Sequence, residues 1–136
     1  MGTQSPAVRT LTQIDYVRLT RLASLSDRDA SEAVQALLEE SDLVASAAVP
    51  ATVVTMYTQV LLQGDTDTAP YKVTLCYPDD AEPSQGFISV LSPLGASLLG
   101  LRVGDVARWR TPLGGERTAR IVEVLFQPEA SGNYTI

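Results

Sequence analysis

Two aspartates at a predicted turn are the clearest candidates for chemistry in this sequence. Asp27 and Asp29 lie in residues 26–29, between two stretches with helical spacing of apolar residues. Carboxylates are suitable ligands for magnesium, and one or two are enough when a second site shares the metal. Aspartate is also favoured at helix starts, where it caps free N–H groups and meets the positive end of the helix dipole. Because capping accounts for both residues, we expect no metal site and no cofactor.

The single cysteine and the absence of histidine exclude several kinds of catalytic site. Without histidine, the chain has no Ser–His or Cys–His nucleophile pair, no histidine base and no histidine metal ligand. Cys76 lies in a strand-like run where no neighbour would stabilise a thiolate, so we expect a buried structural thiol. One cysteine cannot form an internal disulfide, which fits a reducing cytoplasm. We therefore expect a cytoplasmic protein that is not an enzyme and has no catalytic residues.

Composition limits the partners that this chain can have. Its 136 residues suffice for one or two small domains, and 10 Lys and Arg against 16 Asp and Glu give a net charge of −6. An acidic chain has no general attraction for phosphate backbones, so any association with DNA should be indirect. No apolar run approaches the roughly 20 residues that span a bilayer, and residues 1–10 lack the apolar segment of a secretory signal. We expect no membrane partner and a flexible lead-in over residues 1–10.

The spacing of apolar residues predicts two helices early in the chain. The first covers about residues 12–24, with Thr12 as its cap, and the second covers about residues 29–46. The apolar positions of the first helix are Ile14, Val17, Leu22 and Leu25. Two amphipathic helices joined by a short turn form an antiparallel hairpin, which we place at residues 11–49 and which Pro50 ends.

From residue 52 onward the pattern changes to that of strands. Runs rich in valine, threonine and tyrosine, separated by glycine and proline turns, predict five strands and one short helix. The strands are expected at about residues 52–62, 71–77, 86–91, 106–111 and 117–127. Ser92 suits the N-cap of the short helix, Pro93 its first position and Gly100 its C-terminal end. Two helices followed by strands around one helix indicate an α+β fold.

Three motifs in the second half resemble the C-terminal domain of the Gre transcript-cleavage factors. These are ISVLSPLGASLLG at residues 88–100, Gly-Asp at 104–105 and TPLGGE at 111–116. The chain is still more similar to the Rnk family of small Gre-like proteins, through residues 53–56, 74–78 and 127–134 and through total length. The resemblance implies a shortened coiled-coil hairpin, then an FKBP-like domain at residues 50–136 with an antiparallel sheet and one short helix. It also implies RNA polymerase as the partner.

The resemblance also suggests where the site residues lie. In Gre factors the loop that opens the Ser-Pro helix belongs to the polymerase-docking surface, which places Ser92 and Pro93 there, with Leu94 next. Gre factors usually have Asp or Asn where this chain has Leu91, so one polar contact is in doubt. Capping explains the types of Ser92 and Pro93 with or without docking, and the two interpretations are compatible.

Gre factors also carry acidic residues at the hairpin tip, which help to hold a catalytic magnesium in the polymerase. Asp27 and Asp29 occupy this tip, but their spacing does not match the Asp-x-x-Glu of Gre factors. A first helix of roughly 13 residues spans only about 20 Å at 1.5 Å per residue, less than half of a full Gre hairpin. We therefore expect that the chain does not stimulate transcript cleavage.

The leading hypothesis is a polymerase-binding transcription regulator that acts near the secondary channel and excludes Gre factors by competition. One alternative is an FKBP-like peptidyl-prolyl isomerase, which the fold alone would suggest. That activity needs converging aromatic residues, and the one Trp, two Phe and five Tyr of this chain are dispersed. The other alternative, taken from the name of the Rnk family, is regulation of nucleoside diphosphate kinase. Since the chain lacks a Walker-type phosphate loop, that effect would run through transcription or protein contact.

Overall fold

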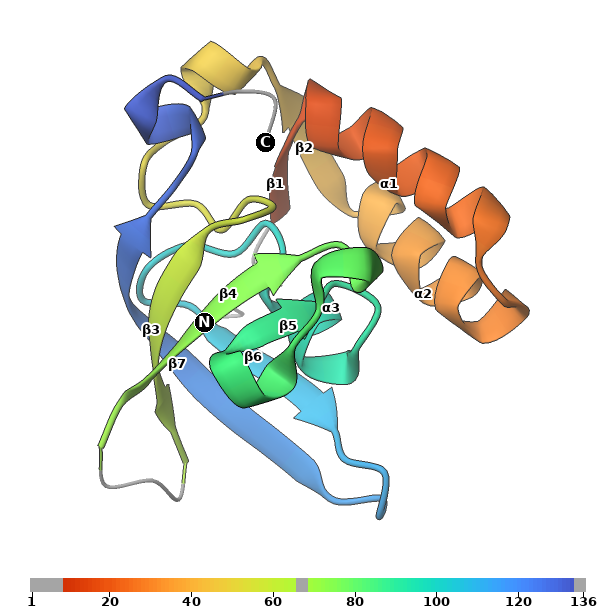
Figure 1. Ribbon diagram of the computed structural model, residues 1–136, viewed down its shortest axis with the longest axis vertical. Coiled ribbons are helices and arrows are strands. Elements are labelled where there is room, and N and C mark those ends of the chain that lie inside the picture. Colours follow the sequence, from red (N-terminus) through yellow and green to blue (C-terminus); the bar gives the residue numbers. More distant parts are fainter. Residues whose placement is uncertain (1–8, 66–68, 134–136) are drawn as a thin grey trace, which may run out of the picture.

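A helical hairpin lies beside a curled five-stranded sheet in the computed structural model, which describes residues 9–65 and 69–133 (Figure 1). The hairpin consists of α1 (Gln13–Leu25) and α2 (Arg28–Glu39), which lie side by side. Two short strands that flank it, β1 (Arg9–Thr12) and β2 (Ser41–Val44), pair in parallel. No helix in the described part of the chain is long and apolar enough to cross a membrane.

The expected second helix is wrong beyond residue 39. The helix ends at Glu39, and the Ser41 hydroxyl donates a hydrogen bond to the Leu37 carbonyl oxygen at 2.7 Å. The chain then becomes extended, because residues 41–44 find backbone partners on β1. Arg9 and Thr10 form the first half of β1, although they were expected in the flexible lead-in. A parallel pair between segments about 30 residues apart leaves no local signal in the periodicity of either segment.

Side-chain caps fix the two helix starts, as predicted. Thr12 Oγ1 accepts the N–H of Asp15 at 3.0 Å, and Asp27 Oδ1 accepts the N–H of Ala30 at 2.9 Å. The buried face of α1 nevertheless differs from the expected one, because Val17 is 67% exposed and Leu25 is 78% exposed. The residues that α1 buries follow the spacing i, i+4, i+8 and are Asp15, Leu19 and Ala23.

The main sheet has the strand order β5-β4-β3-β7-β6. Its strands are β3 (Gln59–Gly64), β4 (Tyr71–Cys76), β5 (Phe87–Ser89), β6 (Val106–Arg110) and β7 (Glu116–Phe126). All neighbours pair antiparallel except β4 and β5, so the expected antiparallel sheet is wrong at this edge. Two 3₁₀ turns, Pro78–Asp80 and Pro83–Gln85, return the chain so that β5 runs in the direction of β4.

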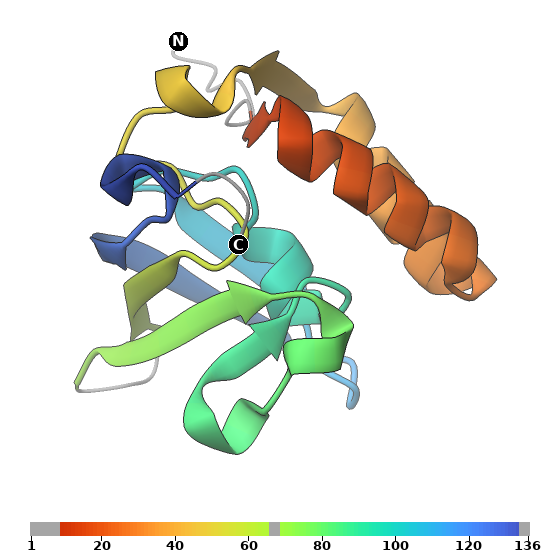
Figure 2. The ribbon, with the colours of Figure 1, turned by 45° about the horizontal axis from the view of Figure 1, so that its top comes forward.

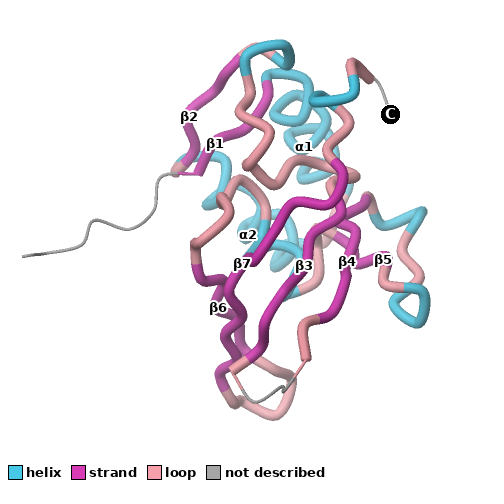
Figure 3. The backbone as a smooth tube through the Cα atoms, turned by 90° about the vertical axis from the view of Figure 1, so that its left-hand side faces the viewer, coloured by secondary structure: helices cyan, strands magenta, loops and turns pink. Residues whose placement is uncertain are grey.

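The core lies between the sheet and the helices, and the opposite face of the sheet is open (Figure 3). The short helix α3 (Pro93–Leu98) packs against this core through Leu98, which is fully buried. Trp109 is half-buried against the core, while Arg108 and Arg110 are exposed, so the side chains of β6 alternate between the two faces of the sheet. Cys76 is fully buried, and burial raises the pKa of its thiol, as expected for a structural cysteine.

Hydrogen bonds join the hairpin to the sheet domain at the end that carries β1. Arg9 Nη1 donates to the carbonyl oxygens of Ala96 at 3.1 Å and Leu99 at 2.7 Å, at the C-terminal end of α3. The backbone N–H of Thr10 donates to the Gly100 carbonyl oxygen at 3.0 Å. Toward its tip, the hairpin leans away from the sheet (Figure 2). The hairpin is therefore anchored at its base.

Candidate functional site

The start of α3, the first candidate site, is held by a small network of hydrogen bonds. Ser92 Oγ accepts the N–H of Gly95 at 3.1 Å and donates to the carbonyl oxygen of Ser89 at 2.7 Å. The N–H of Leu91 donates to Ser89 Oγ at 3.0 Å. The predicted cap at Ser92, with Pro93 as the first helical residue, is thus confirmed. The Ser92 hydroxyl is used within the protein.

Close packing makes glycine necessary at position 95. A Cβ atom there would lie 2.0 Å from the Ser89 carbonyl oxygen, far inside van der Waals contact. The first turn of α3 therefore lies directly on the end of β5. Pro93 is exposed, while Ser92 and Leu94 are half-buried, so a partner at this loop would meet Pro93 most fully. The loop is a rigid projection with a small apolar tip.

A shallow groove of about 240 Å³ lies beside this loop, between α2 and α3. Its lining residues are Arg9, Ala33, Ala36, Leu37, Glu40, Pro93, Ala96, Ser97 and Arg108. Arg9 Nε lies 3.7 Å from Glu40 Oε2, and burial lowers the pKa of the arginine although Glu40 opposes this effect. The hairpin thus contributes one wall of the surface around Pro93.

The hairpin tip, the second candidate site, lies at the end of the hairpin away from β1 and β2 (Figure 1). Asp27 and Asp29 are both exposed, and Asp27 caps α2. Between them, Arg28 forms an ion pair with Glu32 at 3.1 Å. In the described part of the chain, no three acidic or cysteine side chains gather where they could hold a metal ion. The tip and the α3 loop come from different parts of the fold and do not form one site.

A second groove, of about 400 Å³, was not found by sequence reasoning. One wall is α1. The other consists of Tyr57, which comes just before β3, and of residues 77–79, which follow β4 directly. Its lining residues are Arg18, Arg21, Leu22, Leu25, Tyr57, Tyr77, Pro78 and Asp79. Arg18, Arg21, Leu22 and Leu25 are three, four and seven residues apart and so lie on one face of α1, but nothing in the sequence indicated the opposite wall.

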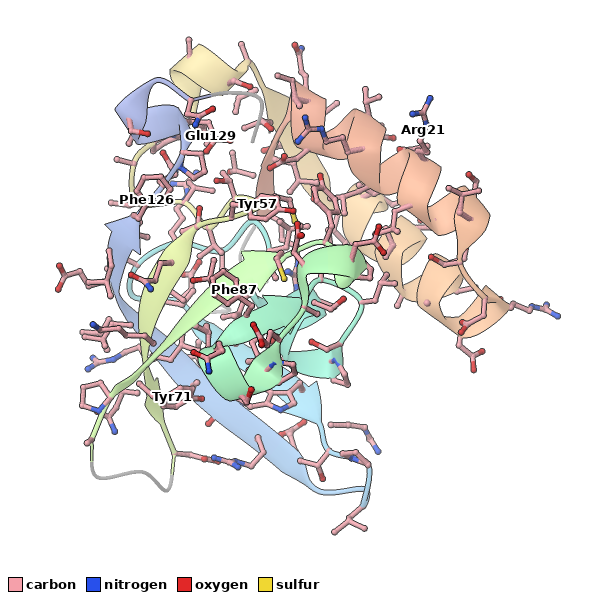
Figure 4. All side chains as sticks on the ribbon, viewed as in Figure 1. Arg21, Tyr57, Tyr71, Phe87, Phe126 and Glu129 are labelled. Carbon is pink, nitrogen blue, oxygen red and sulfur yellow. The ribbon has the colours of Figure 1, made fainter. Side chains whose placement is uncertain are left out.

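Two tyrosines, Tyr57 and Tyr77, are part of the far wall of this groove, and Figure 4 labels Tyr57. Their ring centroids are 5.8 Å apart, with the planes tilted by 59°. Tyr57 has φ +65°, a conformation that a bulky residue rarely adopts, and its hydroxyl donates to Asp80. Burial, followed by the effect of Asp80, raises the pKa of Tyr57 to about 12. Phe87 and Phe126 lie on β5 and β7 and do not line this groove.

A buried carboxyl group lies where α1 meets the sheet domain. Asp15 is only 4% exposed, and its Oδ2 accepts the N–H of Met56 at 3.2 Å. Burial raises the pKa of Asp15 to about 6, and the nearby Glu129 carboxylate adds to this effect. Glu129 in turn accepts the hydroxyl of Thr55 at 2.7 Å. The two acids thus bond to the neighbouring residues Met56 and Thr55, one from the base of the hairpin and one from the C-terminal segment.

Comparisons with known proteins agree with the resemblance in the motifs. The family described as "Transcription elongation factor, GreA/GreB, C-term" matches residues 49–126. The "Regulator of nucleoside diphosphate kinase" of Escherichia coli (strain K12) is 36% identical over 106 residues, which cover 78% of each chain. "Transcription elongation factor GreA" of Solidesulfovibrio magneticus is 60% identical over 63 residues, covering 46% of this chain and 38% of that relative.

A solved structure supports the same assignment at the level of the fold. The structure described as "Prokaryotic transcription elongation factor GreA/GreB from Nitrosomonas europaea" superposes with a TM-score of 0.75 at 33% sequence identity. The superposition covers 89% of this chain and 100% of that chain. The matched family region contains the whole five-stranded sheet and α3. The chain belongs to the GreA/GreB family of transcription elongation factors, with the regulator of nucleoside diphosphate kinase among its relatives.

Proposed function

We propose that this protein regulates transcription by binding RNA polymerase through the loop Ser92, Pro93 and Leu94. The main support is that the family match covers residues 49–126 and so includes this loop, which the structure holds rigid with Pro93 exposed. A capped loop loses little conformational entropy when a partner binds. The half-buried Leu94 supports the loop from the core side, while Pro93 supplies the contact.

In this proposal the protein acts near the secondary channel of the polymerase and competes there with Gre factors. Residues 50–136, an FKBP-like domain, supply the affinity, and the short coiled-coil hairpin at residues 11–49 shapes the outcome. The net charge of −6 makes direct binding to DNA unfavourable, so DNA is approached only through the polymerase. The protein acts where the polymerase is, in the cytoplasm, and has no enzymatic activity of its own.

We also propose that the protein does not stimulate transcript cleavage. With 13 residues, α1 extends about 20 Å at 1.5 Å per residue, which is short for reaching a deeply placed active centre. The Asp27 carboxylate is also engaged as a helix cap, and the ion pair between Arg28 and Glu32 adds a cation at the tip. Metal-assisted cleavage requires carboxylates placed to within a fraction of an ångström of the metal.

A binding competition tests the proposed function directly. Immobilised core polymerase should retain the protein, and an excess of Gre factor should release it. The same experiment with Pro93→Glu should show weaker retention, because a charge would enter the apolar contact. Leu113→Glu, at a leucine that is 99% exposed in the turn between β6 and β7, is the matched control and should bind normally. Independent binding of this protein and Gre factor would refute the shared site.

A second candidate function is contact with nucleoside diphosphate kinase, which the printed name of the Escherichia coli relative favours. The described residues offer no cluster of metal ligands and no Walker-type loop, so protein contact is the route that fits the chain. Sedimentation of this protein with purified kinase alone, and in a second sample with polymerase alone, separates the two functions. A complex with the kinase alone supports direct regulation, whereas a complex with polymerase alone supports the first proposal.

A further inference from the structure

The two helices of the hairpin present different surfaces to solvent. On α1, the strip Val17, Arg21 and Leu25 repeats every four residues, and both of its apolar side chains are more than half exposed. The single acid of this helix, Asp15, is buried, so the exposed charge of α1 is positive. By contrast, α2 exposes one arginine, Arg28, and three acids, which are Asp29, Glu32 and Glu39, so its exposed charge is negative overall. Of these two helices, α1 combines large exposed aliphatic residues with a positive net charge, whereas α2 exposes no large aliphatic residue.

This strip adjoins the groove of about 400 Å³ between α1 and the sheet domain. Leu22 and Leu25 form the apolar part of the helical wall, and Tyr57 and Tyr77 face them. The volume is within the range of clefts that hold small ligands or a few side chains. Figure 4 shows Tyr57 on the sheet-domain side and Arg21 extending from α1. An aliphatic side chain can enter the groove while a neighbouring carboxylate stays near Arg21.

The tyrosine wall is already ordered before any partner arrives. Tyr57 keeps its backbone at φ +65°, its hydroxyl is bonded to Asp80, and its ring contacts Tyr77. Sparsely populated backbone conformations of this kind persist where the surrounding structure holds them, often at binding sites. A wall that is fixed in advance loses little entropy on binding. These contacts hold the tyrosine wall in place within the protein.

We propose that the α1 strip and the tyrosine groove form a second contact surface for the polymerase, one that takes an acidic protein segment with an aliphatic side chain. This inference rests on the proposed binding of polymerase and names a surface separate from the α3 loop. The aliphatic side chain enters between Leu22 and the two tyrosines, and the acidic residue pairs with Arg21. Asp79 borders the groove and repels phosphate and carboxylate alike, so the acidic residue stays outside the groove, near Arg21. The apolar walls take an aliphatic side chain, which RNA does not have, so a protein segment fits better than RNA.

A photo-cross-linking experiment with core polymerase tests this surface. A benzophenone amino acid replaces Leu25, which is 78% exposed, and in a control protein it replaces Leu113, which is 99% exposed. We expect a covalent product with one polymerase subunit from position 25 and none from position 113. Mass spectrometry of the product should find the cross-link in a peptide that contains both acidic and aliphatic residues.

A charge reversal at Arg21 tests the same surface through the affinity for core polymerase. Arg21→Glu should weaken binding to core polymerase about tenfold at low salt, because it places like charges together at the contact. Arg120→Glu, which makes the same charge change on exposed β7, should leave the affinity unchanged. Circular dichroism confirms that both variants are folded.

The outcomes separate this inference from the proposed function. If the unmodified protein binds polymerase but position 25 gives no product and Arg21→Glu binds normally, the second contact is refuted and the docking proposal stands. A cross-link from position 25 to RNA in a transcribing complex would also refute the protein-segment assignment. If the unmodified protein does not bind polymerase at all, both proposals fail together.

Discussion

Replacing Asp15 by asparagine should stabilise the protein at neutral pH. The carboxyl group is 4% exposed, accepts the Met56 N–H, and lies near Glu129, so its charged form is held in an unfavourable place. Asparagine has nearly the same shape and keeps an oxygen that can accept the same N–H. The substitution therefore removes the buried charge while keeping the hydrogen bond that links α1 to the sheet domain.

The size of the effect follows from the shift in the pKa of Asp15. A rise from 3.8 to about 6 corresponds to about 3 kcal/mol, at about 1.36 kcal/mol for each tenfold change in proton affinity. Because the folded state binds the proton more tightly than the unfolded state, stability falls as pH rises from about 4 to about 6 and is then constant. At pH 7 we expect Asp15→Asn to be more stable by about 1–3 kcal/mol, since the new amide N–H₂ must also find a partner.

Urea unfolding followed by the fluorescence of Trp109, the single tryptophan, measures this difference. The advantage of Asp15→Asn should shrink as the pH is lowered from 7 to 4, because Asp15 then becomes neutral in the folded wild-type protein. Asp42→Asn, the same chemical change at an exposed aspartate of β2, should show no such trend. A less stable Asp15→Asn protein at pH 7, or an advantage independent of pH, would show that the buried charge is not the controlling factor.

Other substitutions test the remaining parts of the argument. Gly95→Ala should destabilise the protein by about 1–3 kcal/mol in thermal unfolding, because its Cβ would collide with the carbonyl that ends β5. Arg9→Ala should cost about 1.5–3 kcal/mol, measured by urea unfolding, by removing charge-assisted hydrogen bonds to α3. Ser92→Asp retains a capping oxygen, so circular dichroism should show a normal fold while retention on polymerase falls. In backtracked complexes with labelled RNA, the protein should not increase magnesium-dependent cleavage, and the double variant Asp27→Ala, Asp29→Ala should behave in the same way. Stimulated cleavage that the double variant abolishes would show that the short hairpin does reach the active centre.

The sequence was sufficient to predict features that depend on neighbouring residues. The caps at Thr12, Asp27 and Ser92 each join a side chain to an N–H three residues later, so both partners lie in one short segment. The family motifs at residues 88–116 are short continuous segments, so they can be recognised without the tertiary structure. The α3 loop could therefore be named as a candidate site.

Features that depend on distant residues were decided only by the tertiary structure. Residues 41–44 became a strand because β1 offered backbone partners, against the helical periodicity that extended to residue 46. The buried face of α1 was set by what packs against it, which left Val17 and Leu25 exposed and enclosed Asp15. The tyrosine groove joins α1 to residues about 35–60 positions later in the chain. Hydrogen bonds within one turn are encoded by adjacent side chains, whereas burial, strand pairing and grooves depend on which surfaces the whole chain brings together.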